Sequence, residues 1–136
     1  MTTCHSNVVF TIPGPAQAKQ RPRMNIKTGR IYTPGDTHKY ERLVRKSYGD
    51  NPCFKDQFIS IKILFKFEVP KSYSKKKRDE ALAGNLRPTK GDIDNYIKSV
   101  LDGLNKVAFL DDRYICNITA EKIFAEESET IVEIKN

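Results

Sequence analysis

The strongest constraint on the fold is a run over residues 58–67 in which apolar side chains recur at every second position. The apolar members are Ile59, Ile61, Ile63, Phe65 and Phe67, and the positions between them include Ser60, Lys62 and Lys66. Because successive side chains of a strand point to opposite faces, this alternation predicts a β-strand with one buried and one wetter face. The chain must therefore build a sheet that is covered on one side.

The first part of the chain predicts a strand, a hairpin and a helix. Residues 8–12 form a short apolar run that is typical of a buried strand. Residues 19–33 are rich in basic side chains, and Gly29 favours a turn within them, so they predict a loose hairpin. A helix is expected to follow, with Asp36 or Thr37 as its N-cap.

The last part of the chain predicts one more helix and two more strands. The charged segment 72–86 is compatible with a short surface helix or with a loop. Residues 92–106 predict an amphipathic helix, because apolar side chains recur at helical spacing. Alternation over residues 114–120 predicts a strand that buries Cys116, and residues 130–134 predict a closing strand that forms a hairpin with it.

Length and composition fit a single α+β domain spanning residues 1–136, with a mixed β-sheet and helices packed on one face. No apolar run approaches the length that crosses a membrane, and the N-terminus lacks the apolar stretch of a signal peptide. A cytoplasmic protein without a membrane partner is therefore expected. The three cysteines, Cys4, Cys53 and Cys116, include no CxxC pair, which argues against a disulfide framework or a zinc site.

Charge is distributed unevenly along the chain. Residues 1–90 carry 19 Lys and Arg against 7 Asp and Glu, an excess of 12 positive charges, whereas residues 91–136 carry 5 against 10. A basic surface attracts polyanions, so the first part is expected to contact nucleic acid phosphates. The expected contact residues are Lys19, Arg21, Arg23, Lys27, Arg30, Lys75, Lys76 and Lys77.

Acidic side chains gather around the helix predicted over residues 92–106. Asp92 and Asp94 flank Ile93, so both carboxylates face the same side if the backbone is extended there, and Lys98 lies one helical turn after Asp94. Residues 107–112 are long enough to return antiparallel along the helix and bring Asp111 or Asp112 to the others. The spacing therefore permits one site within one chain, and equally permits ligands shared across a dimer.

Carboxylates without histidine favour Mg²⁺, or Mn²⁺ as a substitute, because these ions prefer oxygen ligands. Such a site can activate water for hydrolysis of a phosphodiester. The alternative is purely structural, with Asp94 as an N-cap, Lys98 as its ion-pair partner and residues 111–112 as a polar turn. Asp102 lies four residues from both Lys98 and Lys106, and is expected to form a structural ion pair.

Two motifs with their spacing resemble the RusA family of Holliday junction resolvases. The first is Asp92-Ile-Asp94-Asn95-Tyr-Ile-Lys98, and the second is Phe109-Leu-Asp111-Asp112. The family's N-terminal pattern also resembles this chain, which has a strand at 8–12, the basic segment 19–23 and Tyr32-Thr-Pro34. The resemblance covers nearly the whole chain, and its specific part is residues 90–113.

The resemblance implies a RusA-like fold and a metal-dependent endodeoxyribonuclease that cuts four-way DNA junctions symmetrically in recombination and repair. It implies that Asp92, Asp94 and Asp112 bind the catalytic metal, that Lys98 is the family's essential lysine, and that Asp111 is a further candidate ligand. It also implies a homodimer on branched DNA and no small-molecule cofactor. A C2 dimer with two active sites matches the near two-fold symmetry of a four-way junction.

Two positions depart from the family pattern. Gly91 stands where a proline is often found, which predicts a looser approach to the first aspartate. Tyr96 stands where leucine is usual, and its ring is expected either in the core or against DNA.

Two other functions fit parts of the sequence. The first is a catalytically silent nucleic-acid-binding module of a phage or mobile element, in which the basic residues would be the whole function. The second is a phosphatase-like hydrolase with Asp92 as nucleophile, which needs a buried apolar strand leading to the aspartate. Residues 87–91 do not provide that strand, since they read Arg-Pro-Thr-Lys-Gly.

Overall fold

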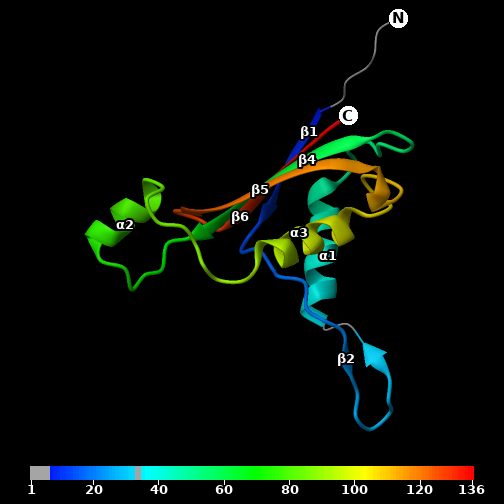
Figure 1. The fold of residues 1–136 in the computed structure, drawn as a ribbon, viewed down its shortest axis with the longest axis horizontal. Helices are drawn as coiled ribbons and strands as arrows, with labels where there is room; N and C mark the ends of the chain where they lie inside the picture. Colours follow the sequence, from blue (N-terminus) through cyan, green and yellow to red (C-terminus); the bar gives the residue numbers. More distant parts are fainter. Residues whose placement is uncertain (1–6, 33–34) are drawn as a thin grey trace, which may run out of the picture.

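The computed structural model describes residues 7–32 and 35–136, and it contains a four-stranded mixed sheet with helices on one face (Figure 1). The strand order is β1-β6-β4-β5, in which β4 and β5 are parallel and the other neighbours are antiparallel. The bounds of these strands are β1 Asn7–Pro13, β4 Ile59–Glu68, β5 Ile115–Ala125 and β6 Glu129–Lys135. The predicted α+β class and the mixed sheet are confirmed.

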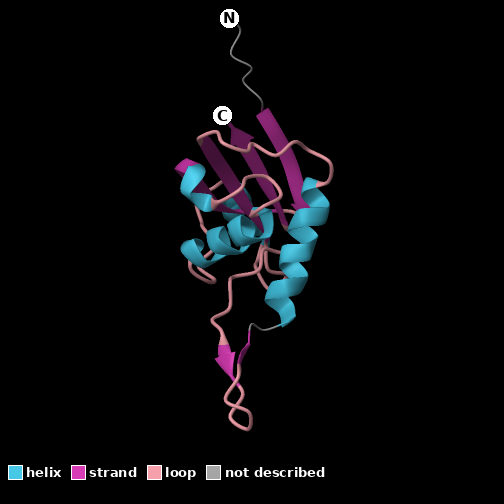
Figure 2. Cartoon of the chain, turned by 90° about the vertical axis from the view of Figure 1, so that its right-hand side faces the viewer, coloured by secondary structure: helices cyan, strands magenta, loops and turns pink. Residues whose placement is uncertain are grey.

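The remaining elements lie around this sheet. The helices are α1 Gly35–Tyr48, α2 Lys75–Leu82 and α3 Ile93–Leu104, followed by the short 3₁₀ helix η1 Asp112–Tyr114. Strands β2 Arg23–Met24 and β3 Ile31–Tyr32 pair as a separate hairpin that projects from the body beyond α1 (Figures 1 and 2). Helices α1 and α3 pack against each other over the sheet, while α2 lies beyond its end.

The core follows directly from the alternation in β4. Ile61 and Ile63 are buried, and the strand register sets each of them opposite a buried residue of β6, Ile134 and Val132 respectively. Residues Val8 and Phe10 of β1 continue the same two rows. Rows of cross-strand apolar side chains are the unit that stabilises such a sheet, and α1 and α3 exclude water from them.

Helices α1 and α3 approach each other closely at Gly103. A Cβ atom on this residue would lie 2.7 Å from Cβ of Val44 in α1. The contact therefore requires the absence of a side chain at position 103, and it fixes how α3 crosses the sheet.

The parallel pairing of β4 and β5 determines whether each end of α3 lies at the amino ends or at the carboxyl ends of these strands. A parallel pair needs a crossover connection, and here α2 and α3 form it. Helix α3 runs back along the sheet before β5 begins, so its first residues lie at the carboxyl ends of β4 and β5 and its last residues at their amino ends (Figure 1).

Several sequence predictions need correction. Strand β5 is an edge strand, so Cys116 is exposed rather than buried, and Ile118 is 43% exposed. The last two strands do not form the expected hairpin, because β6 pairs with β1 and β4 and not with β5. Helix α1 already includes Asp36 and Thr37 in its first turn, so neither is the N-cap. Residues 33–34, as well as Cys4, lie outside the described residues.

Two open alternatives are resolved by the same description. Within residues 72–86 the chain forms α2, and the Ser74 side chain caps it by accepting a hydrogen bond from the backbone N–H of Lys77. Tyr96 belongs to the core, where it contacts the rings of Phe65 and Phe67. No helix in the described ranges has the length and apolar character needed to cross a membrane.

Candidate active site

Asp92 and Asp94 lie together at the beginning of α3. Asp92 is the N-cap residue, with extended backbone at φ −93° and ψ 131°, but its side chain makes no capping hydrogen bond, and Asp94 lies in the first turn. The prediction of Asp94 as N-cap is therefore wrong by two residues. Both side chains are exposed, and both line an open pocket of about 660 Å³. Both carboxylates are therefore open to solvent at the positive end of the helix dipole, where negatively charged groups are favoured.

The backbone that leads into this pair is tightly held. Gly91 adopts φ +70°, and a Cβ atom there would lie 2.5 Å from the hydroxyl oxygen of Tyr96. That hydroxyl donates a hydrogen bond of 3.2 Å to the carbonyl oxygen of Lys90. Burial raises the pKa of Tyr96, and the negative charge of Asp92 raises it further. The expected looser approach at Gly91 is wrong, because glycine permits a close one here.

Strand β5 and the loop before α3 together contribute three charged residues to the same pocket that the sequence did not single out. Glu121 and Lys122 come from its second half, and Arg87 comes from the loop before α3. The Arg87 guanidinium lies 3.0 Å from the Glu121 carboxylate. The charge pattern alone carried no signal for these residues, because only the parallel register of β4 and β5 brings this part of β5 beside the start of α3.

Lys98 follows Asp94 by one turn of α3 and is exposed. Within residues 7–32 and 35–136 it forms no ion pair, either with Asp94 or with Asp102. Its ammonium group is thus not engaged by a carboxylate of the described residues. The structural alternative, in which Lys98 serves as the i,i+4 partner of Asp94, is not what the structure contains.

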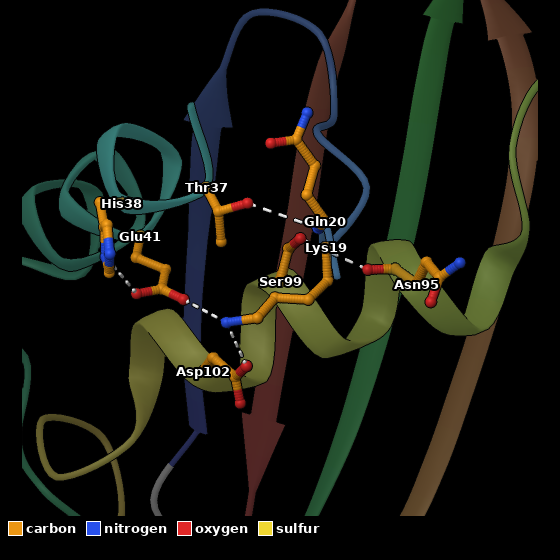
Figure 3. Close-up of polar contacts among 8 residues, drawn as sticks. All are labelled: Lys19, Gln20, Thr37, His38, Glu41, Asn95, Ser99 and Asp102. Carbon is orange, nitrogen blue, oxygen red and sulfur yellow. Dashed lines mark hydrogen bonds and ion pairs between the residues drawn. The ribbon is translucent and has the colours of Figure 1, made fainter. Parts of the chain in front are cut away.

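Lys19 lies in an ion-pair cluster between α1 and α3 (Figure 3). Its ammonium group is 2.8 Å from Glu41 and 2.9 Å from Asp102, and its backbone N–H donates to the carbonyl oxygen of Asn95 at 2.9 Å. Partial burial works to lower the pKa of Lys19, but the hydrogen bonds and charges of Glu41 and Asp102 outweigh it and raise the pKa above the usual 10.5. Asp102 is therefore a structural ion-pair residue as predicted, although its partner is Lys19.

Asp111 and Asp112 lie at the other end of α3. The helix is 12 residues long, about 18 Å at 1.5 Å per residue. After it the chain turns sharply, with the N–H groups of Val107 and Ala108 bonded to the carbonyl oxygen of Leu104. The run that returns along α3 is β5, which begins only at Ile115. The expected return over residues 107–112 is therefore wrong, because η1, which begins with Asp112, directly precedes β5 at the amino ends of β4 and β5.

In the described part of the chain, no group of three or more carboxylate, histidine or cysteine side chains is arranged to hold a metal ion. Asp111 has a local role instead, since its carboxylate caps η1 by accepting a 2.9 Å hydrogen bond from the backbone N–H of Arg113. That hydrogen bond, followed by one with Asp112, lowers the pKa of Asp111. Asp112 is exposed and does not cap the helix through its side chain.

The predicted phosphate-binding residues fall on two projecting elements. Arg21, Arg23, Lys27 and Arg30 are exposed on or beside the β2–β3 hairpin. Lys75, Lys76 and Lys77 are exposed in the first turn of α2, where the Lys77 ammonium lies 4.1 Å from the centre of the Tyr73 ring. Lys19 differs from all of these, because it is held between Glu41 and Asp102.

Comparison with known proteins identifies the family. The family model described as endodeoxyribonuclease RusA matches residues 13–135, which is nearly the whole chain. The chain belongs to the RusA endodeoxyribonuclease family. A protein of Bacillus subtilis strain 168, YqaN, described as uncharacterized, is 32% identical over 136 residues, covering 94% of this chain and 95% of the relative.

RusA membership gives the chain its general activity. The family consists of endodeoxyribonucleases, hydrolases of DNA phosphodiester bonds that act on branched DNA and generally depend on a divalent metal. The match includes α3 and both groups of aspartates, which the fold separates by the length of the helix.

Proposed function

We propose that this RusA-family protein resolves Holliday junctions, cutting two strands symmetrically by Mg²⁺-dependent hydrolysis during DNA recombination and repair, with Mn²⁺ as a substitute ion. The observation that carries the proposal is the pair of exposed carboxylates, Asp92 and Asp94, on one open pocket at the start of α3. Neither side chain makes a capping hydrogen bond or an ion pair among the described residues, so the carboxylate oxygens of both are available to a ligand.

These two residues fit a hard divalent cation. Mg²⁺ is typically held by one or two carboxylates together with water and substrate phosphate oxygens. When bound, it activates a water molecule and stabilises charge on the leaving oxygen. In this proposal Asp92 and Asp94 hold the ion, and the pocket admits the scissile phosphate.

Asp112 is proposed to complete the site from a second subunit. It is the first residue of η1, which follows the end of α3, whereas Asp92 precedes the start of a helix that spans about 18 Å. In a C2 dimer each contact between the subunits occurs twice. Asp112 of the partner subunit would then join Asp92 and Asp94 of one subunit, and the same three residues would form a second site with the roles of the subunits exchanged. Asp111 would cap η1 and orient this aspartate rather than bind metal.

Lys98 is proposed as the cation that stabilises negative charge on the phosphate in the transition state, or that orients the attacking water. Its position one turn from Asp94, without an ion-pair partner among the described residues, supports this role. Preorganised cations directed at developing charge are among the largest contributions to phosphoryl-transfer catalysis.

The substrate would be held electrostatically by the exposed basic residues of the hairpin and of α2. These are Arg21, Arg23, Lys27, Arg30, Lys75, Lys76 and Lys77. Junction affinity should then fall steeply with salt, because each phosphate contact releases counterions.

A labelled synthetic four-way junction, compared with plain duplex, tests the function. Paired symmetric nicks that appear only in the junction and only with Mg²⁺ or Mn²⁺ are the expected result. Asp92→Asn and Asp112→Asn should each abolish cleavage and keep junction binding. Binding by the wild type without cleavage at any metal concentration would instead favour a catalytically silent binding module. This alternative is worth testing because the described residues of one chain contain no complete set of metal ligands.

Subunit mixing tests the shared site. Asp92→Asn and Asp112→Asn proteins, inactive alone, are unfolded together, refolded and assayed. With shared sites, a mixed dimer has one site with both substitutions and one intact site, so single-strand nicking of the junction returns. If each site lies within one chain, both sites of a mixed dimer stay damaged and no nicking returns.

A further inference from the structure

The β2–β3 hairpin carries large apolar side chains that are mostly exposed to solvent. Ile26 is 92% exposed, Ile31 74% and Met24 62%. These are among the most exposed large hydrophobic side chains of the described residues, and they lie on an element that projects away from the core (Figure 2). Grouped exposed apolar side chains mark a contact surface more often than chance.

The tip of the hairpin has a defined conformation that is held by hydrogen bonds. Met24 pairs with Ile31 across the strands, and the N–H of Asn25 bonds to the carbonyl oxygen of Arg30 at 2.8 Å. The Asn25 side chain accepts a 2.9 Å hydrogen bond from the N–H of Lys27, and Gly29 closes the turn at φ +69°. Ile26 therefore stands at a defined apex.

The root of the hairpin is fixed to the helix that opens with Asp92 and Asp94. Lys19 bonds through its N–H to Asn95 in the first turn of α3, and its ammonium group reaches Asp102 further along (Figure 3). The backbone N–H of Gln20 donates to the hydroxyl of Thr37 in α1 at 3.4 Å. The segment that enters the hairpin is thus anchored to α1 and to α3, the helix that carries the candidate active site.

Charge around the apex selects the kind of partner. Residues 20–32 contain four basic side chains, Arg21, Arg23, Lys27 and Arg30, and no acidic one. A hairpin with an apolar apex and basic side chains along its length is complementary to a molecule that has anionic groups on its surface and apolar groups in its interior. Nucleic acid has this character, and architectural proteins bind it by placing apolar wedges between base steps beside phosphate-binding cations.

We propose that the β2–β3 hairpin is a wedge that enters the branch point of the DNA junction, with Ile26 inserted against a base pair and Arg23, Lys27 and Arg30 on the flanking phosphates. This inference rests on the proposed function. A base pair at a branch point lacks a continuous stack on one side, so opening it costs less than opening a pair within duplex. The wedge would thereby favour junctions over plain duplex.

The test uses the full-length protein without divalent metal, so that no cleavage occurs, and a junction with 2-aminopurine at the branch point. Saturating wild-type protein should raise the fluorescence severalfold, because the base becomes unstacked. Ile26→Ala should abolish most of this rise and weaken junction binding roughly tenfold, the effect of losing the burial of such a side chain. Val9→Ala is the matched control, because Val9 is 62% exposed but lies on β1, and it should behave as the wild type.

Two further measurements separate the outcomes. Arg30→Ala should weaken binding but leave the fluorescence rise intact at saturation, because it removes only a phosphate contact. An unchanged fluorescence rise in Ile26→Ala would overturn the wedge, even if the protein cleaves junctions normally. A shift of the free protein from dimer to monomer in Ile26→Ala, seen by light scattering, would also overturn it by assigning the apex to a second copy of the chain. If the wild type raises the fluorescence but does not cleave the junction, the proposed nuclease function is wrong. The proposed insertion of the hairpin would still be supported.

Discussion

The ammonium group of Lys122 donates a 2.9 Å hydrogen bond to the carbonyl oxygen of Gly91 and so joins β5 to the residue immediately before Asp92. A second, longer bond of 3.4 Å runs from the same group to the carbonyl oxygen of Lys90. Strand β5 pairs with β4 in parallel, and Lys122 lies opposite Phe65 on the face that the helices cover. The sheet thus positions the first aspartate of the site through a side chain, not only through helix packing.

Lys122→Met should lower the rate of junction cleavage at saturating substrate. We expect a loss of roughly tenfold, since small displacements of catalytic groups have large effects on rate. Junction affinity should change little, because the ammonium group binds backbone oxygens of the protein. Lys135→Met is the control, since Lys135 forms an ion pair of 3.1 Å with Glu133 on β6. A loss of affinity with an unchanged rate would instead make Lys122 a DNA contact.

Gly91→Ala should destabilise the fold, because it adds a Cβ atom 2.5 Å from the Tyr96 hydroxyl to a backbone at φ +70°. We expect the free energy of unfolding, measured by urea titration, to fall by about 3 kcal/mol. Gly84→Ala separates the two causes, since Gly84 has φ +88° but an added Cβ atom would meet nothing within 4 Å. It should cost only about 1 kcal/mol. Equal losses in both variants would show that the contact with Tyr96 is relaxed.

The sheet and α3 could be predicted from sequence because their patterns are local. Alternation in residues 58–67 requires one buried face, and the apolar stripe of residues 92–106 requires the helix to cover it. Cys116 was misassigned because alternation does not report whether a strand is central or at an edge, and β5 has a neighbour on one side only.

The site was predicted as a set of residues but not as an arrangement. Asp92 and Asp94 adjoin in sequence and in space, so their spacing sufficed. The length of the connection allows Asp112 to lie beside them. The parallel pairing of β4 and β5 instead places η1, which begins with Asp112, at the amino ends of these strands. The sequence likewise does not distinguish Lys19 from Arg21 as a phosphate contact, because both side chains are positively charged. Only the packing of α1 on α3 shows that Lys19 is paired with Glu41 and Asp102.

Lys19→Met should destabilise the protein at neutral pH. The substitution leaves the Glu41 side chain, 11% exposed, beside Asp102 without the cation that both share. We expect a loss of about 2 kcal/mol in the free energy of unfolding, between the values of exposed and buried pairs. Lys66→Met is the matched control, because Lys66 serves the single carboxylate of Glu129 at 3.0 Å, and it should cost about 0.5 kcal/mol. Similar losses in both variants would contradict a special role for the Lys19 cluster.

The Tyr48 hydroxyl should make stability sensitive to alkaline pH. Burial, followed by the charge of Cys53, raises its pKa from 10.0 to about 12, and the hydroxyl donates a hydrogen bond to the carbonyl oxygen of Pro52. Because the pKa is higher in the folded than in the unfolded protein, the stabilising contribution is complete below pH 10 and is lost as the pH rises toward 12.

The variant Tyr48→Phe tests this dependence. It should lose about 1 kcal/mol at pH 7 with its hydrogen bond, but its free energy of unfolding should fall less steeply between pH 10 and pH 12 than that of the wild type. Parallel curves for the two proteins over that interval would assign the alkaline loss to other groups.

Asp111 and Asp112 are adjacent, yet they should respond differently to the same substitution. The Asp111 carboxylate accepts a hydrogen bond from the backbone N–H of Arg113 and caps η1, and the side-chain oxygen of asparagine can accept the same bond. Asp111→Asn should therefore retain cleavage within a few fold, whereas Asp111→Ala, which removes the capping oxygen, should reduce both cleavage and stability. Asp112→Asn should abolish cleavage without loss of stability, since its carboxylate is proposed to bind metal. Cleavage assays paired with urea titrations of the three variants provide the check, and complete loss of activity in Asp111→Asn with normal stability would make Asp111 a metal ligand as well.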